Sequence, residues 1–466
     1  MLAPGPSSLA ATVNFLRSAL RRYRRSGAGG PVAANVAWLL LERGVQLVTG
    51  LAVSILLARY LGASQFGELN FLISLVALLA PLAALGLNHI LTKYFVEDPD
   101  NADRAAGTAM ALRFGGGFVA IAVAQIVLLF VRPGDGWSQI FGLYLGVGAL
   151  FNAFLVIEFW FLAKVESRFV AIAKIVGALI SVATKALAVM LGADFQVFVI
   201  LTALDYVVVG LLLLVAYQIR TKGVARLRAS LSTAGRQLGQ SWWLILSGLT
   251  ATVNLKIDQV MLGVISTPTE VGLYAVAARL SEVWYFVPEI IVSSLFASIL
   301  RARLDDPEAY QKQLQKVYTL LAWLGISVAV VATVIGPPLI RLLYGQEYSA
   351  SGTLLVVHIW AGVFMSMRAL FSKWLIAEEL LKFSLYTQAA GAVTNVLLNL
   401  LLIPVYGAMG AAVSTVISYG ISSFGALLLT ARTRQPAKMM ILALFAPALA
   451  ICHAISRRLS RGSRHV

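Results

Sequence analysis

The chain of 466 residues contains little charge and almost no cysteine. Only 12% of its residues are charged, whereas 59% are hydrophobic, and Cys452 is its single cysteine. One cysteine excludes an internal disulfide. The four histidines form no cluster with zinc-site spacing, and neither an HExxH motif nor a phosphate-binding glycine loop is present. We therefore expect no metal site, no cofactor and no enzymatic chemistry of these classes.

Long apolar runs dominate the sequence instead. Runs of about 20 residues recur along it, and each can cross the roughly 30 Å hydrocarbon core of a bilayer as a helix. They lack the two-residue alternation of membrane strands. The sequence thus predicts an all-α membrane protein with about 12 transmembrane helices, near 35–58, 67–91, 105–131, 138–162, 169–191, 196–218, 239–265, 272–300, 317–340, 352–376, 384–403 and 409–430.

The net charge of +16 follows membrane topology rather than nucleic-acid binding. Alternate connections between the predicted helices, counted from the N-terminal segment, hold 22 Lys and Arg residues, whereas the intervening connections hold only Arg59, Arg132 and Arg341. This is the positive-inside bias, and it places the N-terminus in the cytoplasm. Residues 1–34 form a basic cytoplasmic segment without the apolar core of a signal peptide, either as a surface helix or as a disordered tail.

The hydrophilic connection at 219–238 divides the chain into two blocks of six helices, an N-lobe at 35–218 and a C-lobe at 239–431. Faint glycine repeats relate the blocks, and six helices between partners imply a pseudo-two-fold axis along the membrane normal. Residues 432–466 form a basic tail that contains a thirteenth apolar segment at 439–455. Because a thirteenth span would put four arginines outside, we expect this segment to be re-entrant or interfacial.

Eight cations lie inside the apolar runs. Each would cost roughly 2.5–3.5 kcal/mol if it faced lipid at the centre of the bilayer, so they must face protein or water. Six acids share these runs, which leaves a balance of +2. This pattern indicates a membrane protein that handles anions. The cations are Arg43, Arg113, Lys174, Lys185, Lys256, Arg279, Arg368 and Lys373.

Two local patterns and a third supporting one identify a family. The first is Asn395-xxx-Asn399-xxx-Ile403-Pro404-x-Tyr406-Gly407-xx-Gly410-Ala411-Ala412-xx-Thr415. The second is Asp258-Gln259-Val260-Met261-Leu262-Gly263, followed by Glu270-Val271-Gly272-x-Tyr274-xx-Ala277-x-Arg279 and by Pro288. The third is Arg341-Leu342-x-Tyr344-Gly345-xx-Tyr348. Together they resemble the polysaccharide transporter family, the O-antigen-type flippases of the multidrug/oligosaccharidyl-lipid/polysaccharide exporter superfamily. The similarity covers residues 33–431.

The resemblance implies two six-helix lobes in a V shape, in the inner membrane of a bacterium. Such proteins carry an undecaprenyl-pyrophosphate-linked oligosaccharide from the cytoplasmic to the external leaflet by alternating access. The sugar-pyrophosphate head crosses a cationic cavity while the polyprenyl tail stays in membrane lipid. Polysaccharide polymerase and synthesis proteins are the partners that this resemblance suggests.

The cations differ in the role that their positions predict. Cavity arginines on the first and eighth helices are typical of such flippases, and Arg43 and Arg279 are similar in position, although Arg279 has Glu282 three residues on as an alternative partner. Lys256, Arg368 and Lys185 are further candidates for the cavity. The remaining three, Arg113, Lys174 and Lys373, lie near the expected cytoplasmic helix ends, where their side chains can snorkel to water.

Polar residues of the motifs have two interpretations each. Asn395 and Asn399 share a helix face, so they either link helices or contact sugar hydroxyls. Asp258 and Glu289 lie away from the expected cytoplasmic surface and are the candidates to bind a coupling proton or sodium ion, although most such acids neutralise neighbours. Lys256 and Asp258 point in nearly opposite directions and are not expected to pair.

Three other functions compete with flipping. A multidrug or organic-cation antiporter of the same superfamily would want acidic groups and aromatic stacking in its cavity, which the +2 balance disfavours. A membrane glycan polymerase or ligase would need long external loops, and the predicted ones are at most about ten residues long. A scaffold without transport would tolerate alanine at its buried charges.

Overall fold

The computed structural model describes residues 29–221, 227–428 and 430–446, and within them it contains helices and no strands. This confirms the all-α prediction. The longer helices are α2 (Gly29–Ala84), α3 (Asn88–Glu97), α4 (Ala102–Val131), α5 (Gly136–Leu150), α6 (Val156–Ala163), α7 (Ser167–Met190), α8 (Phe195–Thr221), α9 (Leu231–Ile265), α10 (Pro268–Glu282), α11 (Phe286–Asp305), α12 (Pro307–Tyr344), α13 (Ser349–His358), α14 (Ala361–Ala377) and α15 (Leu381–Gly420).

Seven of the helices in the described ranges are long and apolar enough to cross a membrane, and nine are if each of two bent pairs is one span. The predicted count of twelve stays a prediction. α2 and α15 are each too long for one crossing, and both turn sharply at a glycine with positive φ, Gly62 at 72° and Gly407 at 54°. Since a side chain would strain this backbone conformation, the two glycines explain why each continuous helix folds back as two.

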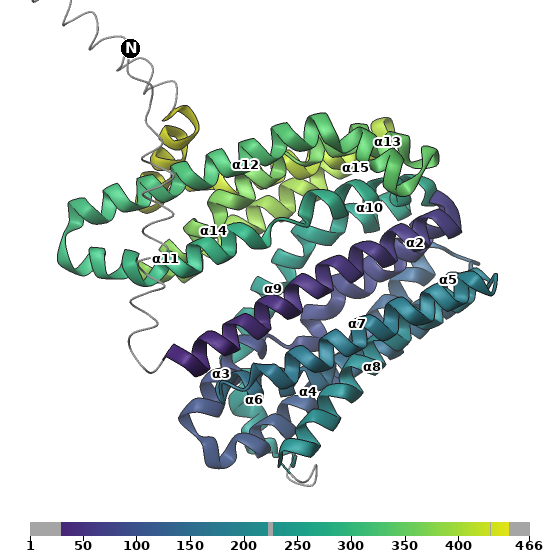
Figure 1. Cartoon of the computed structure of the whole chain (residues 1–466), viewed down its shortest axis with the longest axis horizontal. Coiled ribbons are helices and arrows are strands. Elements are labelled where there is room, and N and C mark those ends of the chain that lie inside the picture. Colours follow the sequence, from purple (N-terminus) through teal and green to yellow (C-terminus); the bar gives the residue numbers. More distant parts are fainter. Residues whose placement is uncertain (1–28, 222–226, 429, 447–466) are drawn as a thin grey trace, which may run out of the picture.

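Figure 1 shows the helices in two groups. We call α2–α8 the N-terminal group and α10–α15 the C-terminal group, and α9 passes between them. The first half of α9 contacts the N-terminal group, where Gln237 donates to the carbonyl of Ala105 at 3.1 Å. Its second half contacts α15, where Asn254 donates to the carbonyl of Gln388 at 3.0 Å. α9 therefore belongs to both groups.

The two groups converge at the end of the bundle that carries Gly62. Arg59 donates two hydrogen bonds to the carbonyls of Leu342 and Leu343 in the last turn of α12, at 2.5 and 2.7 Å. The backbone N–H of Ala63 donates to Glu347 at 2.7 Å. These bonds satisfy carbonyls at the C-terminal end of α12 and an N–H group just after the corner at Gly62. We call this end the closed end; the ribbons diverge toward the opposite end, where Gly29 begins α2 (Figure 1).

Two glycines make the closed end tight. A Cβ on Gly272 of α10 would lie 2.2 Å from the carbonyl oxygen of Ala63, and one on Gly67 would lie 1.7 Å from that of Pro268. Only hydrogen atoms fit at such distances. The glycines therefore allow α2 and α10 to pack backbone against backbone, as small residues do in membrane helix pairs.

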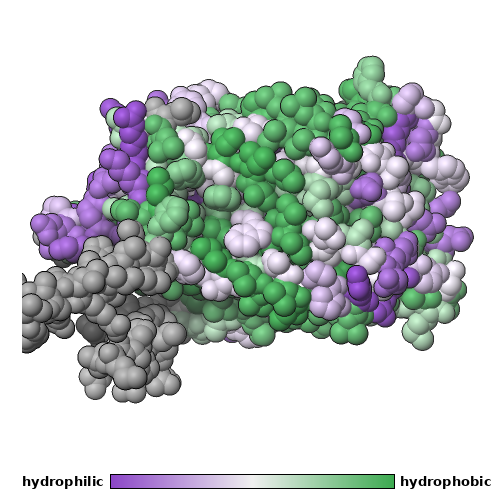
Figure 2. All heavy atoms as spheres, turned by 90° about the horizontal axis from the view of Figure 1, so that it is seen from above, coloured by the Kyte–Doolittle hydropathy of each residue, from purple (hydrophilic) through white to green (hydrophobic). Residues whose placement is uncertain are grey.

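The outer surface is apolar around the middle of the bundle. Figure 2 shows a broad hydrophobic band with hydrophilic residues gathered at both ends. Large side chains such as Phe130 and Leu401 are exposed on this surface. An exposed apolar band of this kind is expected where lipid, rather than water, surrounds the protein. The chain is a multi-pass membrane protein.

The boundaries at the predicted linker and the C-terminal tail need correction. α9 begins at Leu231 rather than 239, so helix replaces much of the predicted linker; in its first turns Leu231 and Arg236 are exposed, whereas Gln237 is buried. Of the predicted segment 439–455, residues 439–446 belong to a helix over 434–446 that packs beside α12. There Gln315 and Trp323 donate to the carbonyls of Met439 and Ala443, each at 3.0 Å. Residues 1–28 and 447–466 lie outside the described residues.

The close packing at Gly272 predicts a conformational effect of substitution. Gly272→Leu should push α10 away from α2, because overpacking against backbone typically costs about 1–3 kcal/mol or more. Spin labels at the exposed Tyr60 and Leu342, in a chain with Cys452→Ser, should then report a longer distance across the closed end. Gly235→Leu is the control, since nothing lies within 4 Å of a Cβ at Gly235 on α9. An unchanged distance in Gly272→Leu would show that this packing does not hold the closed end together.

Candidate functional site

Arg43 and its neighbour Glu42 lie on different faces of α2, and the two faces have different surroundings. Its neighbour Glu42 is buried and points into the N-terminal group, where it lies 3.4 Å from the amine of Lys174 on α7. Lys174 also binds Glu158 at 2.7 Å. Arg43 is exposed and makes no ion pair or hydrogen bond with another described residue. The guanidinium is therefore free to bind another group.

Arg279 extends from α10 toward α2 at the point where the two helices converge. Its guanidinium donates to the carbonyl of Gly50 at 3.0 Å. A Cβ on Gly50 would come within 3.1 Å of the same nitrogen, so the arginine is closely seated. It forms no ion pair with Glu282 within 4 Å among the described residues, although it is accessible to solvent. The alternative of an intrahelical pair is therefore not seen in this geometry.

The two arginines face the same region. Arg43 and Gly50 are seven residues apart, which is nearly two helical turns, so they share one face of α2 about 10 Å apart along the axis. Arg279 contacts that face at Gly50. We call this the interlobe face of α2: the face that carries Arg43 and Gly50 and is turned toward the C-terminal group. Two uncompensated cations on it make a region suited to an anion.

Lys256 is a third cation without an ion partner in the described ranges. It is half-buried on α9, and its charge and that of Arg279 both act on Glu282, which lies at the end of α10. Asp258 acts on the same carboxylate, so this neighbourhood holds two cations and two acids. Lys256 and Asp258 do not pair, as their spacing predicts, because Asp258 turns into the C-terminal group.

Asp258 lies in a buried polar cluster. It is 2% exposed and accepts hydrogen bonds from Tyr274 at 2.9 Å, from Asn399 at 2.6 Å and from Thr415 at 2.8 Å. Asn399 also donates to Asn395 at 3.0 Å. No cation from a described side chain lies within 4 Å of the carboxylate. Burying an isolated carboxylate is expensive, so neutral donors alone suit a group that takes up a proton or a small cation.

The arrangement around Asn395 and Asn399 bears on their two interpretations. Both side chains are fully buried at 0% exposure. Asn395 donates to Ser418 of the same folded helix at 3.2 Å, and Asn399 links it to Asp258 of α9. In this conformation they connect helices and do not face an open space, which favours the helix-linking interpretation, and sugar contacts stay a prediction.

Three other candidate residues lie away from the interlobe face. Lys185 is 2% exposed and binds Asp205 at 2.5 Å inside the N-terminal group, so its charge is already neutralised. Arg368 is 8% exposed and donates to the carbonyl of Ser422 at 2.7 Å, within the π-helical turn Ile421–Gly425. Glu289 is exposed on α11 and takes no part in the buried acid cluster. This geometry does not support Lys185 and Arg368 as cavity cations.

The predicted snorkelling residues also differ from expectation. Arg113 is buried at 5% exposure and Lys174 is held between two carboxylates, so neither reaches water along the helix. Lys373 lies 5.9 Å from the ring centre of Phe296. Position along a helix indicated depth, but it could not show which side chains of other helices lie nearby.

Sequence reasoning missed the partners of Asp258. Tyr274 and Thr415 stand within the quoted motifs, and each hydroxyl donates to the same carboxylate oxygen. Their place in motifs around Asp258 and Asn399 was the signal that could have found them. No group of three or more His, Cys, Asp or Glu that could hold a metal ion occurs among the described residues.

Two proteins with similar sequences are named as probable flippases. The chain is 30% identical over 177 residues to the probable flippase AglR of Haloferax volcanii, a match that spans 36% of each chain. It is 21% identical over 372 residues to the probable low-salt glycan biosynthesis flippase Agl15 of the same organism, which covers 78% of this chain and 76% of Agl15. The chain thus matches about a third of the length of AglR.

Solved structures with a similar fold have low sequence identity. The lipid II flippase MurJ in an inward closed conformation matches with a TM-score of 0.67 at 14% identity and covers 90% of this chain and 93% of its own. An inward-facing multidrug resistance MATE transporter of the MOP superfamily matches with a TM-score of 0.69 at 15% identity, over 86% of this chain and 98% of its own. These likenesses show a shared fold.

A family model settles the relationship that the motifs predicted. The model described as polysaccharide biosynthesis protein matches residues 56–353, which is well over half of the chain and includes both α2's corner and the Asp258 motif. This multi-pass membrane protein therefore belongs to the polysaccharide biosynthesis protein family.

Proposed function

We propose that the protein flips a polyprenyl-pyrophosphate-linked oligosaccharide across a membrane and makes or breaks no covalent bond. The observation that carries this proposal is the pair of uncompensated arginines, Arg43 and Arg279, on opposite sides of the interlobe face. A guanidinium binds phosphate through charge-assisted hydrogen bonds. The names of the relatives, which are flippases of glycan synthesis, support the same class of cargo.

The proposed mechanism is alternating access between the two groups of helices. The head group enters where the groups diverge and binds Arg43 first, about 10 Å before it meets Arg279 near the closed end. Opening of the closed end then releases it on the other side, while the polyprenyl tail stays in lipid. In this scheme the predicted division at 219–238 separates the two lobes that rock against each other.

Sidedness and cargo are the finer parts of the proposal. The positive-inside bias supports a cytoplasmic N-terminus, so the diverging end would open to the cytoplasm. In a bacterial inner membrane the carrier would be undecaprenyl pyrophosphate, with polysaccharide polymerase and synthesis proteins as partners. The named relatives come from an archaeon, so the carrier chain is a variable to test.

The antiporter alternative is weakened by where the acids lie. Glu42 and Glu158 share Lys174 inside the N-terminal group, and Asp258 is enclosed by neutral donors. On the interlobe face the free side chains that we assign are basic. An organic cation would be repelled there, whereas a pyrophosphate would be attracted.

The test is a leaflet assay in proteoliposomes. Undecaprenyl-pyrophosphate oligosaccharide is loaded inside, and its appearance outside is followed with a lectin. Arg43→Ala and Arg279→Ala should each lower the rate about 10- to 100-fold, because a hydrogen bond to a charged group contributes about 1.5–3 kcal/mol. Arg301→Ala, at an exposed position of α11, is the charge-matched control and should flip normally.

Each result of that assay has a distinct meaning. Flipping that survives both arginine substitutions would keep the function and remove the site. If the wild type flips no candidate glycolipid, with undecaprenyl or with longer polyprenyl carriers, the proposed cargo is wrong. Uptake of an organic cation by the same vesicles would favour the antiporter instead.

We further propose that the Asp258 cluster couples transport to a cation gradient. Asp258, the Asn399 amide oxygen and the Thr415 hydroxyl offer oxygen ligands of the kind that Na⁺ or a proton requires. The Asn399 oxygen is buried and has no hydrogen-bond partner among the described residues, which supports an unfilled ligand position. Glu289 is the other candidate that the sequence suggested.

Substitution distinguishes these two acids. Asp258→Asn should flip at the rate seen without a gradient and should show no acceleration by a sodium or pH gradient, because the carboxylate that binds the ion is lost. Glu289→Gln should retain the acceleration. The measurement is the flipping rate with an inward Na⁺ gradient, with a pH gradient and with neither. A gradient response that persists in Asp258→Asn would exclude this cluster as the coupling site.

A further inference from the structure

The N-terminal group contains a cavity that the proposed transport path does not use. It has a volume of about 370 Å³ and lies between the second half of α2, α4, α5 and the turn that follows α5, with Tyr206 of α8 over it. Neither Arg43 nor Arg279 lines it. At this size it is comparable with the smaller pockets that bind organic ligands.

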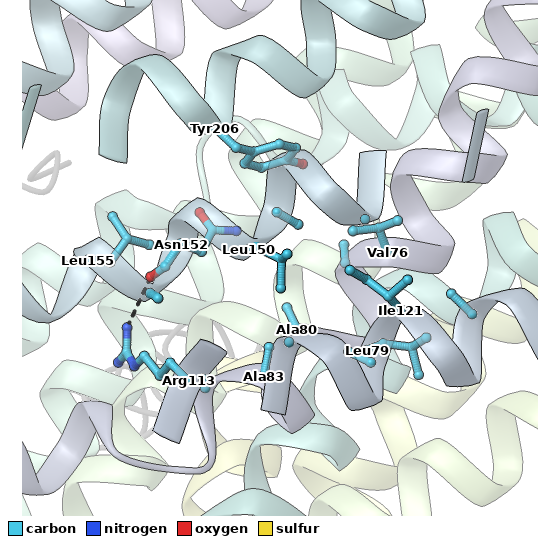
Figure 3. Close-up of a pocket in the computed structure, with 18 of the residues that line it drawn as sticks. Val76, Leu79, Ala80, Ala83, Arg113, Ile121, Leu150, Asn152, Leu155 and Tyr206 are labelled. Carbon is cyan, nitrogen blue, oxygen red and sulfur yellow. Dashed lines mark hydrogen bonds between the residues drawn. The ribbon is translucent and has the colours of Figure 1, made fainter. Parts of the chain in front are cut away.

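The cavity changes character from one end to the other (Figure 3). Arg113 and Asn152 lie at one end, and Val76 and Ile121 lie at the other. Along α4 the lining runs from Arg113 to Ala124, a distance of about 16 Å for a helix. An elongated cavity whose lining is mostly apolar suits one extended hydrocarbon chain.

Arg113 supplies an unsatisfied charge at the polar end. It is 5% exposed and donates to the side-chain oxygen of Asn88 and, at 3.4 Å, to the carbonyl of Asn152. Its Nε is buried without a hydrogen-bond partner in the described ranges. Glu158 also lines the cavity, but its carboxylate is bound at 2.7 Å by Lys174. A buried cation with a free donor beside an apolar channel calls for an anion.

We propose that this cavity binds a single-chain lipid with an anionic head, the head on Arg113 and the chain along α4 between Gly117 and Ala124. Small residues on three helices line the channel: Ala120 and Ala124 on α4, Ala80 and Ala83 on α2, and Ala149 on α5. A bound chain would fill space between α2 and α4 that protein atoms leave empty. The binding is independent of flipping and does not rest on it.

Two natural sources share this chemistry, a fatty acid and a polyisoprenyl phosphate. The experiment therefore uses two diazirine probes, one on palmitate and one on geranylgeranyl phosphate, with the purified full chain in nanodiscs. We expect saturable labelling at one lipid per protein, with the modified residues among those that line the cavity. The probe that labels at the lower concentration identifies the source.

Matched substitutions test the site. Ala120→Phe fills the apolar channel and should raise the half-saturating probe concentration at least 10-fold, whereas Ala111→Phe, exposed on the same helix, should not change it. Arg113→Gln should weaken both anionic probes about 10-fold but leave a geranylgeraniol probe unaffected; Arg104→Gln, which is exposed on α4, is its control.

The Ala120→Phe result stands even if Arg113→Gln does not fold, which melting curves of each variant reveal. Equal labelling of Ala120→Phe and Ala111→Phe would overturn the proposal, as would labelling confined to residues that do not line the cavity. Labelling that depends on Ala120 but not on the charge of Arg113 would also overturn it, since such a cavity would bind the hydrocarbon chain without recognising the anionic head.

Discussion

A charge inside an apolar membrane protein must be paired, hydrated or neutralised, and this constraint orders the whole structure. Some of the buried cations meet it inside the protein, as Lys185 does with Asp205 and Lys174 with two glutamates. These pairs hold helices together and have no charge left for a ligand. Arg43 and Arg279 meet the constraint differently, by remaining accessible at the surface where the two groups of helices face each other. Whether a cation is used within the protein or stays available to a ligand depends on whether it has an ion partner, and not on its depth in the membrane.

The same reasoning fits the closed end, where the described residues show no ion pair between the two groups of helices. Backbone carbonyls accept from Arg59, and Gly67 and Gly272 let α2 and α10 touch. Contacts of this kind contribute modestly in a membrane, where interhelical hydrogen bonds are worth about 0.6 kcal/mol on average. An end held by several weak contacts can open without the large cost of separating buried ion pairs. A transporter that alternates between two states needs such a balance.

Sequence alone predicted the features that depend on one helix at a time. The all-α fold followed from apolar runs, the turn at Gly407 from its motif, and the shared face of Asn395 and Asn399 from their spacing. Features that depend on two helices were harder to foresee. The periodicity of α7 gives the direction of Lys185, but only the packing of α8 brings Asp205 to it. For the same reason Arg113 was assigned to a helix end, whereas Asn88 and Asn152 bind it in the interior.

α9 links the two groups of helices, and each of its halves is bound to a different group. Its first half is bound to the N-terminal group through Gln237, and its second half carries Asp258 into the C-terminal group. Rocking of the groups must therefore bend or tilt α9 between Gln237 and Asp258, where Gly239 and Gly248 lie. A charge taken up at Asp258 would act on the half of α9 that moves with α10 and α15. That connection offers a physical route by which ion binding in one group could bias the contact of α2 with α10, because both depend on where the second half of α9 lies.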